Sequence, residues 1–164
     1  MKTPNLDNVI KKFARDVIGR AQRNIGATRN VDGKKRRTDT TGTLRTSLVY
    51  HYKNKRLTFG ASGDAEKYAP FVEYGRNPGK QPPPEAILEW INKKPIRLRD
   101  KSGGFIEATE SRKRSLAYLI GRKIGTKGTE GILYYNRAMN EAFRDWDDKI
   151  IDAYLLDVDI NIGL

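Results

Sequence analysis

Residues 68–75 read Tyr-Ala-Pro-Phe-Val-Glu-Tyr-Gly and are the most informative stretch of this sequence. Tyr68, Phe71 and Val72 recur at the spacing of one helical turn, which favours a short helix or turn with one apolar side. Gly75 supplies the residue type that commonly ends such a turn. Glu73 is the one acid in this otherwise apolar stretch.

Glu73 allows two interpretations. A general acid or base would need a partner acid, a metal or a histidine, and no such residue stands at a recognisable spacing. A structural glutamate would accept a hydrogen bond or pair with Arg45 or Arg76, within one subunit or across a subunit boundary. We expect the structural or interfacial role.

A second segment, residues 41–47 (Thr-Gly-Thr-Leu-Arg-Thr-Ser), comes before residues 68–75 and leads into an alternating pattern. Apolar and polar residues alternate on both sides of a turn at residues 54 and 55, which predicts a β-hairpin over about residues 46–61. Gly42 would let the chain bend into the first strand, with Leu44 in the core and Arg45 outside. An ordinary turn entering a strand is the alternative interpretation of residues 41–47.

Apolar residues recur at helical spacing both before and after the segments just described. Apolar residues at spacings of three and four predict an amphipathic helix from about residue 4 to 25, with Thr3 as its N-cap. The same spacing predicts a final helix from about residue 132 to 154.

The end of the chain alternates with a period of two. Val158, Ile160 and Ile162 alternate with polar residues, a pattern that predicts a half-buried strand. We interpret Asp157 and Asp159 as the solvent face of that strand, with a divalent-ion site as the alternative.

Residues 78–128 form a separate group of predicted elements. Prolines 82–84 make a stiff connection into a short helix over about residues 85–91, and a charged loop or small hairpin over residues 97–106 precedes another helix that ends at Gly125. We expect a helical insertion within a single domain spanning residues 1–164. All elements together predict an α+β fold, with an antiparallel sheet of about four strands packed by long N-terminal and C-terminal helices.

The charge of the chain is strongly uneven. The sequence carries 32 Lys and Arg against 20 Asp and Glu, a net charge of +12, yet residues 139–164 hold only 2 of the basic residues and 7 of the acidic ones. Residues 26–40 lack an apolar period and include the run Lys34-Lys35-Arg36-Arg37, so we expect a mobile basic loop there. The basic body would face either nucleic-acid phosphates or acidic neighbouring subunits, and we favour the protein contacts.

The composition restricts the possible chemistry. The chain has no cysteine and one histidine, His51, which excludes disulfides and thiolate metal sites and makes a Ser-His-Asp arrangement hard to build. We therefore expect no catalytic residue, no cofactor and no metal. Without a run of about 18 apolar residues, and with no continuous apolar stretch near its start, the chain is expected to lack a membrane span and a signal peptide and to work in a cytosol-like compartment.

The order of the two segments resembles the neck and tail-completion (head-tail joining) proteins of tailed bacteriophages, in which TG-x-LR-x-S precedes YA-x-x-VE-x-G. The resemblance extends over about residues 4–154, and the pieces PPP-x-AI-x-x-WI and AYLIGRKIGTKG look like an insertion carried by many members of this group. The family-motif residues, for which the resemblance implies structural roles, are Gly42, Leu44, Ser47, Tyr68, Ala69, Val72 and Gly75.

This resemblance implies a virion structural protein and not an enzyme. Its partners would be copies of itself, in a ring of about six subunits, together with other phage neck, portal-adaptor and tail proteins. The ring would sit at the head-tail junction of a virion assembled in the host cytoplasm and would let DNA pass, with non-specific contact to that DNA.

The candidate residues for the subunit interface or the DNA channel are Lys34, Lys35, Arg36, Arg37, Arg45, Glu73 and Arg76. The competing class is a basic DNA-binding protein without sequence specificity. A metal-dependent nuclease comes third.

Overall fold

The computed structural model describes residues 2–31, 34–37, 39, 41–93, 96–100 and 102–162, with side chains for all of these except residues 30, 31, 34–37 and 162. Contacts divide the chain into two compact units, Met1–Glu73 with Ile132–Leu164, and Tyr74–Gly131. The range predicted as an insertion, 78–128, falls within the second unit. The single-domain organisation of residues 1–164 stays a prediction.

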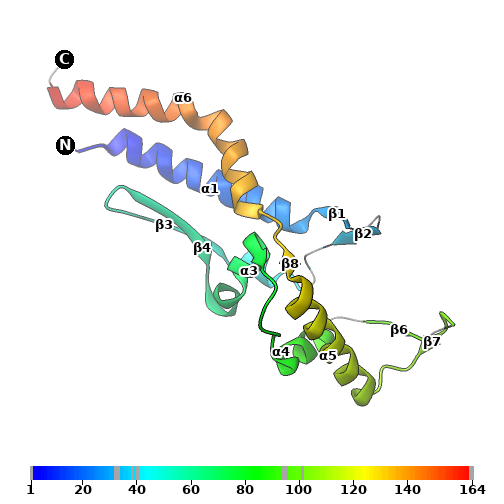
Figure 1. Ribbon diagram of the computed structural model, residues 1–164. Helices are drawn as coiled ribbons and strands as arrows, with labels where there is room; N and C mark the ends of the chain where they lie inside the picture. Colours follow the sequence, from blue (N-terminus) through cyan, green and yellow to red (C-terminus); the bar gives the residue numbers. More distant parts are fainter. Residues whose placement is uncertain are drawn as a thin grey trace. The chain divides into compact units, whose positions relative to one another are not determined.

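Two long helices, α1 (Pro4–Gly26) and α6 (Tyr134–Ile162), form the frame of the first unit. They pack side by side in opposite directions, so the two chain ends lie at the same end of the pair (Figure 1). The prediction of long N-terminal and C-terminal helices is confirmed.

Small and aromatic side chains hold the two helices together. Ala14 and Ala21 on α1 and Ala138 and Ala142 on α6 have no exposed surface, which lets the two backbones approach closely. Phe13 fills the space beyond them, with its ring centroid 4.9 Å from that of Phe143. Burying a side chain of this size contributes about 1.5–3 kcal/mol to the stability of the fold.

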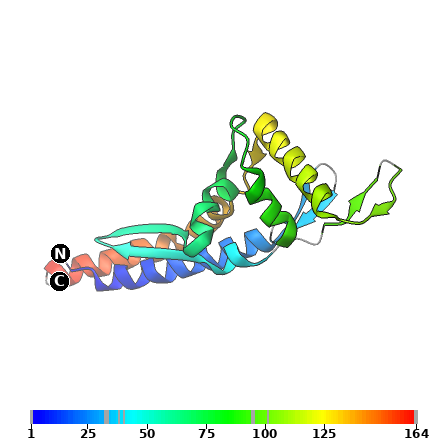
Figure 2. The ribbon, with the colours of Figure 1, turned by 90° about the horizontal axis from the view of Figure 1, so that it is seen from below.

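A hairpin of β3 (Leu48–Lys53) and β4 (Arg56–Ala61) runs alongside α1 (Figure 2). The strands pair in antiparallel register with Tyr50 opposite Phe59, and the turn residues Asn54 and Lys55 have φ angles of 51° and 60°. Positive φ at both turn residues matches the right-handed twist of a tight hairpin, so the predicted hairpin is confirmed.

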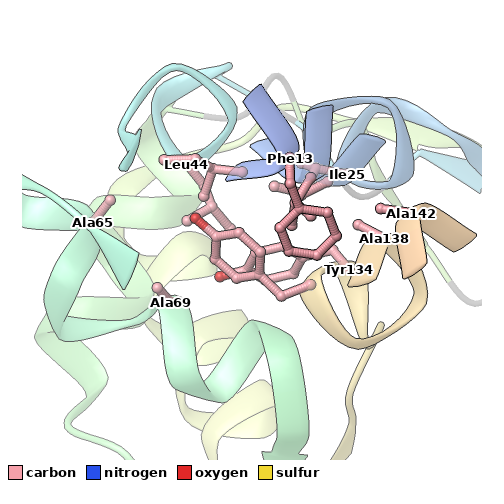
Figure 3. Close-up of a cluster of buried hydrophobic side chains, with 12 residues drawn as sticks. Phe13, Ile25, Leu44, Ala65, Ala69, Tyr134, Ala138 and Ala142 are labelled. Atoms are coloured by element: carbon pink, nitrogen blue, oxygen red, sulfur yellow. The ribbon is translucent and has the colours of Figure 1, made fainter. Parts of the chain in front are cut away.

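Short helices close the core between the hairpin and α6. They are α2 (Thr43–Thr46), the 3-10 helix η1 (Gly63–Lys67) and α3 (Ala69–Tyr74). Leu44, Ala65 and Ala69 of these helices join Phe13 and Tyr134 in one buried cluster (Figure 3). Residues 68–75 therefore contain the short helix that their apolar spacing predicts.

The predicted sheet of four strands is wrong. In the part of the chain that the structure describes, the strands form separate antiparallel pairs. These are β1 (Thr28–Val31) with β2 (Lys34–Arg37), β3 with β4, β5 (Gly75–Arg76) with β8 (Thr129–Glu130), and β6 (Leu98–Arg99) with β7 (Phe105–Ile106). The β3–β4 hairpin buries its apolar side against helices, for example Phe59 against Tyr135, rather than beside further strands.

Residues 26–40 also differ from expectation. The expected basic loop contains the β1–β2 hairpin, in which Arg29 pairs with Arg36 and Val31 with Lys34. A ladder of main-chain hydrogen bonds needs no apolar periodicity, which is why the sequence pattern did not indicate these strands.

The predicted terminal strand is wrong as well, because α6 continues to Ile162. The alternating residues do not share a buried side: Ile160 is 64% exposed, whereas Asp157 has no exposed surface. Helical spacing places Ala153 and Asp157 on the side of α6 that is buried. Asp157 is therefore an interior residue and not part of a solvent face.

The second unit is built on α4 (Pro84–Lys93) and α5 (Glu110–Lys127), which lie beside each other in Figure 1. Ile87 and Ile91 of α4 pack on Ala117 of α5. The β5–β8 pair requires glycine at position 75, where φ is 80° and a Cβ atom would lie 2.2 Å from the carbonyl oxygen of Thr129.

The first turn of α1 is capped by a carboxylate from the far end of the chain. The Asp157 carboxylate accepts hydrogen bonds from the backbone N–H of Asn5 at 3.2 Å and of Leu6 at 2.8 Å. Thr3 stands at the N-cap position as predicted, but its side chain makes no capping hydrogen bond. Since Pro4 has no N–H, Asp157 satisfies the next two unpaired donors of the helix.

Replacing Asp157 with alanine should lower the free energy of unfolding by about 1–3 kcal/mol, because two backbone donors lose their buried acceptor. Asp159→Ala is the matched control, since Asp159 is exposed on the same helix. Urea unfolding followed by circular dichroism measures both. Equal stability of the two variants would contradict the capping role.

A polar cluster fastens the turn of the β3–β4 hairpin to α1. The Tyr52 hydroxyl donates to Asp7 Oδ1 at 2.7 Å, and Lys55 Nζ donates to the same oxygen at 2.6 Å and also contacts Thr3 Oγ1. The hydrogen bonds from Lys55 and Tyr52 lower the pKa of Asp7. Burial, together with the hydrogen bond to Asp7, raises the pKa of Tyr52 from 10.0 to about 12.

The raised pKa of Tyr52 predicts a loss of stability in alkaline solution. As pH rises through 10, the unfolded chain loses this phenolic proton before the folded chain does, so the free energy of unfolding falls between pH 10 and about 12. Tyr52→Phe removes this component and should give a shallower decline. Urea unfolding at several pH values in this range compares the two proteins, and parallel declines would count against the proposed contact.

Candidate functional site

Glu73 caps the N-terminus of α6. Its carboxylate accepts hydrogen bonds from the backbone N–H of Tyr135 at 2.9 Å and of Asn136 at 3.0 Å. The side chain is only 4% exposed. Because the first N–H groups of a helix lack partners within the helix and carry a partial positive charge, a buried carboxylate is stabilised there.

The main chain of α3 also binds the start of α6. The N–H of Ile132 donates to the carbonyl of Val72 at 2.9 Å, and the N–H of Leu133 donates to the carbonyl of Glu73 at 2.9 Å. Segment 68–75 therefore holds the entry to α6 by both backbone and side chain. Tyr135, in the first turn of α6, donates from its hydroxyl to the carbonyl of Gly60 at 2.7 Å and so connects α6 to β4.

Arg29 of β1 lies close enough to Glu73 for their charges to interact. Its guanidinium donates to the carbonyl of Ile132 at 3.0 Å and to the carbonyl of Asn24 at 3.3 Å. Asn24 belongs to the last turn of α1, where unpaired carbonyl groups carry a partial negative charge that favours a cation. Burial and the charge of Arg137 lower the pKa of Arg29, while Glu73 acts in the opposite direction.

Segment 41–47 forms the short helix α2 and is fixed by Asp39. One Asp39 oxygen accepts a hydrogen bond from the N–H of Gly42 at 2.8 Å, and the other lies 3.3 Å from Arg45 Nε. Gly42 has a φ of 77°, which a residue with a Cβ atom adopts at a cost. Leu44 is 7% exposed in the core, and the Ser47 hydroxyl donates to the carbonyl of Leu44 at 2.9 Å.

An open depression with two arginines lies where α1 meets α2. It has a volume of about 660 Å³. Its lining residues are Gly19, Gln22, Arg23, Gly26, Ala27, Arg45 and Thr46. Arg45 is therefore both the partner of Asp39 and a wall of this depression.

The other candidates lie in different places. Arg76 of β5 donates to the carbonyl of Lys80 at 2.6 Å, within the second unit. Lys34, Lys35, Arg36 and Arg37 form strand β2, and their side chains are outside the described part of the structure. Of the family-motif residues, Ala69 is buried, Val72 packs against the core, and burial raises the pKa of Tyr68.

Sequence reasoning missed Arg29 of this site and Asp157, the cap at the other end of the helix pair. Arg29 is a lone arginine in a stretch without periodicity, and its partners Asn24 and Ile132 are recognisable only after folding. Asp157 was assigned to the wrong element. For Glu73 the sequence did offer a signal, because this residue is the one acid in an apolar segment. That signal favours a structural role, and capping a helix is one such role.

The described residues bring together no group of three or more His, Cys, Asp or Glu side chains suited to a metal ion. His51 is an exposed residue of β3, opposite Thr58. None of the described helices is both long enough and apolar enough to span a membrane. The arrangement around Glu73 and Arg29 joins the last turn of α1 to the start of α6.

Comparisons with known protein families, with curated proteins and with solved structures found no match for this chain.

Glu73→Ala should lower the free energy of unfolding by about 1–3 kcal/mol, because the N–H groups of Tyr135 and Asn136 lose their acceptor and Arg29 loses a nearby opposite charge. Glu66→Ala removes an exposed acid of η1 and is the matched control. Denaturant unfolding measures both variants. A Glu73→Ala protein as stable as the control would show that this cap has no energetic role.

Proposed function

We propose that this protein is a structural subunit of a tailed bacteriophage that forms a ring at the head-tail junction. The ring joins the portal-adaptor complex to the tail and lets DNA pass. Its subunits are copies of this chain, and its other contacts are neck and tail proteins.

One observation carries the proposal. The two segments that resemble phage joining proteins, 41–47 and 68–75, contribute Leu44 and Ala69 to a single core cluster with Tyr134 at the start of α6. Segment 68–75 also provides the cap of α6 through Glu73. Residues that build a core and cap a helix are what a scaffold protein needs.

Exposed apolar side chains give further support. Among the described residues, several large hydrophobic side chains of α5 and α6 are about half exposed, including Tyr118, Leu119, Ile151 and Leu155. Apolar groups gathered on the surface of a protein mark sites of contact with other molecules. A ring subunit covers such surfaces when it assembles.

The run Lys34–Arg37 on β2 would serve the ring by facing the passing DNA or an adjoining ring. Changing all four residues to serine should impair head-tail joining, measured as the fraction of tailed particles in electron micrographs. A variant with Lys11, Lys12, Lys53 and Arg56 changed to serine removes the same charge from exposed positions and is the control. If both variants join tails as well as the wild type, the basic run has no role in assembly.

The competing function, a DNA-binding protein outside the virion, is favoured only by the net charge of +12. It predicts that the isolated monomer shifts naked duplex DNA in a gel, with an affinity that falls steeply as salt rises. The ring proposal predicts instead that the protein is a component of purified particles. Monomers that bind DNA and are absent from particles would establish the competing function.

A further inference from the structure

The outward side of α6 carries apolar side chains between acids. Its members recur at spacings of three and four and so share one side of the helix, opposite the buried Ala153. We name Asp147, Asp148, Ile151, Tyr154, Leu155 and Asp159 the α6 outer face. Ile151 is 55% exposed, Tyr154 48% and Leu155 51%.

The outward side of α5 has the same arrangement with the opposite charge. We name Arg114, Tyr118, Leu119, Arg122 and Lys123 the α5 outer face, and all of these side chains are exposed. Tyr118 is 53% exposed and Leu119 57%. Glu110 is the one acid of α5; it pairs with Lys113 at 2.8 Å and lies one turn before Arg114, near the N-terminal end of this face.

We propose that the α6 outer face of one copy of this chain docks on the α5 outer face of a second copy. Both faces have an apolar centre with charged residues toward each end, acidic on α6 and basic on α5, so docking buries the apolar side chains while opposite charges meet. At about 1.5 Å per residue, residues 147–159 span about 18 Å and residues 114–123 about 14 Å, so each face nearly covers the other.

Charge also opposes the symmetric alternatives. Two α6 outer faces would bring Asp147, Asp148 and Asp159 against their equivalents, and two α5 outer faces would do the same with arginines and lysine. Like charges placed together at an interface oppose association. The favoured contact therefore joins unlike surfaces, which leaves one free surface of each kind at the two ends of a growing assembly.

A contact between unlike surfaces closes into a ring when the rotation between neighbours divides a full turn evenly. The proposed contact rests on the proposed ring assembly and identifies the surfaces that would make it. It also gives a function to the acidic end of the chain, where residues 139–164 hold 7 acids and 2 basic residues.

Two full-length variants test the contact, each with one face blocked. The first carries Ile151→Arg and Leu155→Arg, so that its α6 outer face repels the basic α5 face. The second carries Tyr118→Glu and Leu119→Glu on the α5 outer face. The control carries Leu156→Arg and Ile160→Arg, which are exposed positions of α6 outside the outer face. Circular dichroism verifies that all variants fold.

Mass measurement by light scattering and analytical ultracentrifugation gives the readout. The wild type and the control should associate, and each blocked variant alone should bind itself at least about 10-fold more weakly. Mixing the two blocked variants should restore association, in complexes with equal numbers of each, because the intact α5 face of one meets the intact α6 face of the other. Raising the salt concentration should weaken every one of these complexes.

Three results would overturn the proposed contact. The second variant could associate with itself, which would indicate that α6 pairs with α6. Both blocked variants could associate as strongly as the wild type, or the wild type could stay monomeric at its highest soluble concentration. The proposed function fails separately, if the protein is absent from purified phage particles. Rings that form from the blocked variants would reject this contact and leave the ring proposal intact.

Discussion

Two buried carboxylates, one at each end of the antiparallel helix pair, are the interaction on which the first unit depends. Asp157 of α6 holds the N–H groups of Asn5 and Leu6 at the start of α1, and Glu73 holds those of Tyr135 and Asn136 at the start of α6. A buried carboxylate is tolerated only when it is paired or hydrogen-bonded. Each cap therefore favours the one alignment of the helices that satisfies it.

The apolar core and the caps make different contributions. Apolar side chains of α1 and α6, including Phe13, Val17, Ala138 and Ala142, belong to the buried core, but such surfaces tolerate some sliding and repacking. The caps fix the position of each helix along the other, and Arg29 connects the last turn of α1 to the entry of α6. With this frame fixed, the outward side of α6 presents a defined pattern of acids and apolar groups, as the proposed docking with a second copy requires.

Local patterns predicted the local elements well. The helix expected over residues 4–25 is observed as α1, Pro4–Gly26. This prediction succeeded because the apolar spacing of a helix depends only on residues three and four positions apart. The hairpin over residues 46–61 also follows from a local pattern, the alternation of apolar and polar residues.

The sequence could not reveal which residues cap the helices, since the Asp157 carboxylate and the N–H of Asn5 are separated by 152 positions. The alternation of residues 157–162 predicted a strand for a related reason. The contacts of the buried Asp157 with the start of α1 favour continuation of the helix over the strand that the two-residue pattern indicates. Arg29 and Glu73 meet only through the tertiary fold.

Hydrogen exchange of the wild-type protein tests the capping account most directly, residue by residue, by nuclear magnetic resonance. The account predicts that the amides of Asn5, Leu6, Tyr135 and Asn136 exchange as slowly as amides in the middle of α1 and α6, because each donates to a buried carboxylate. Exchange of these four amides at the fast rate of frayed helix ends would contradict it.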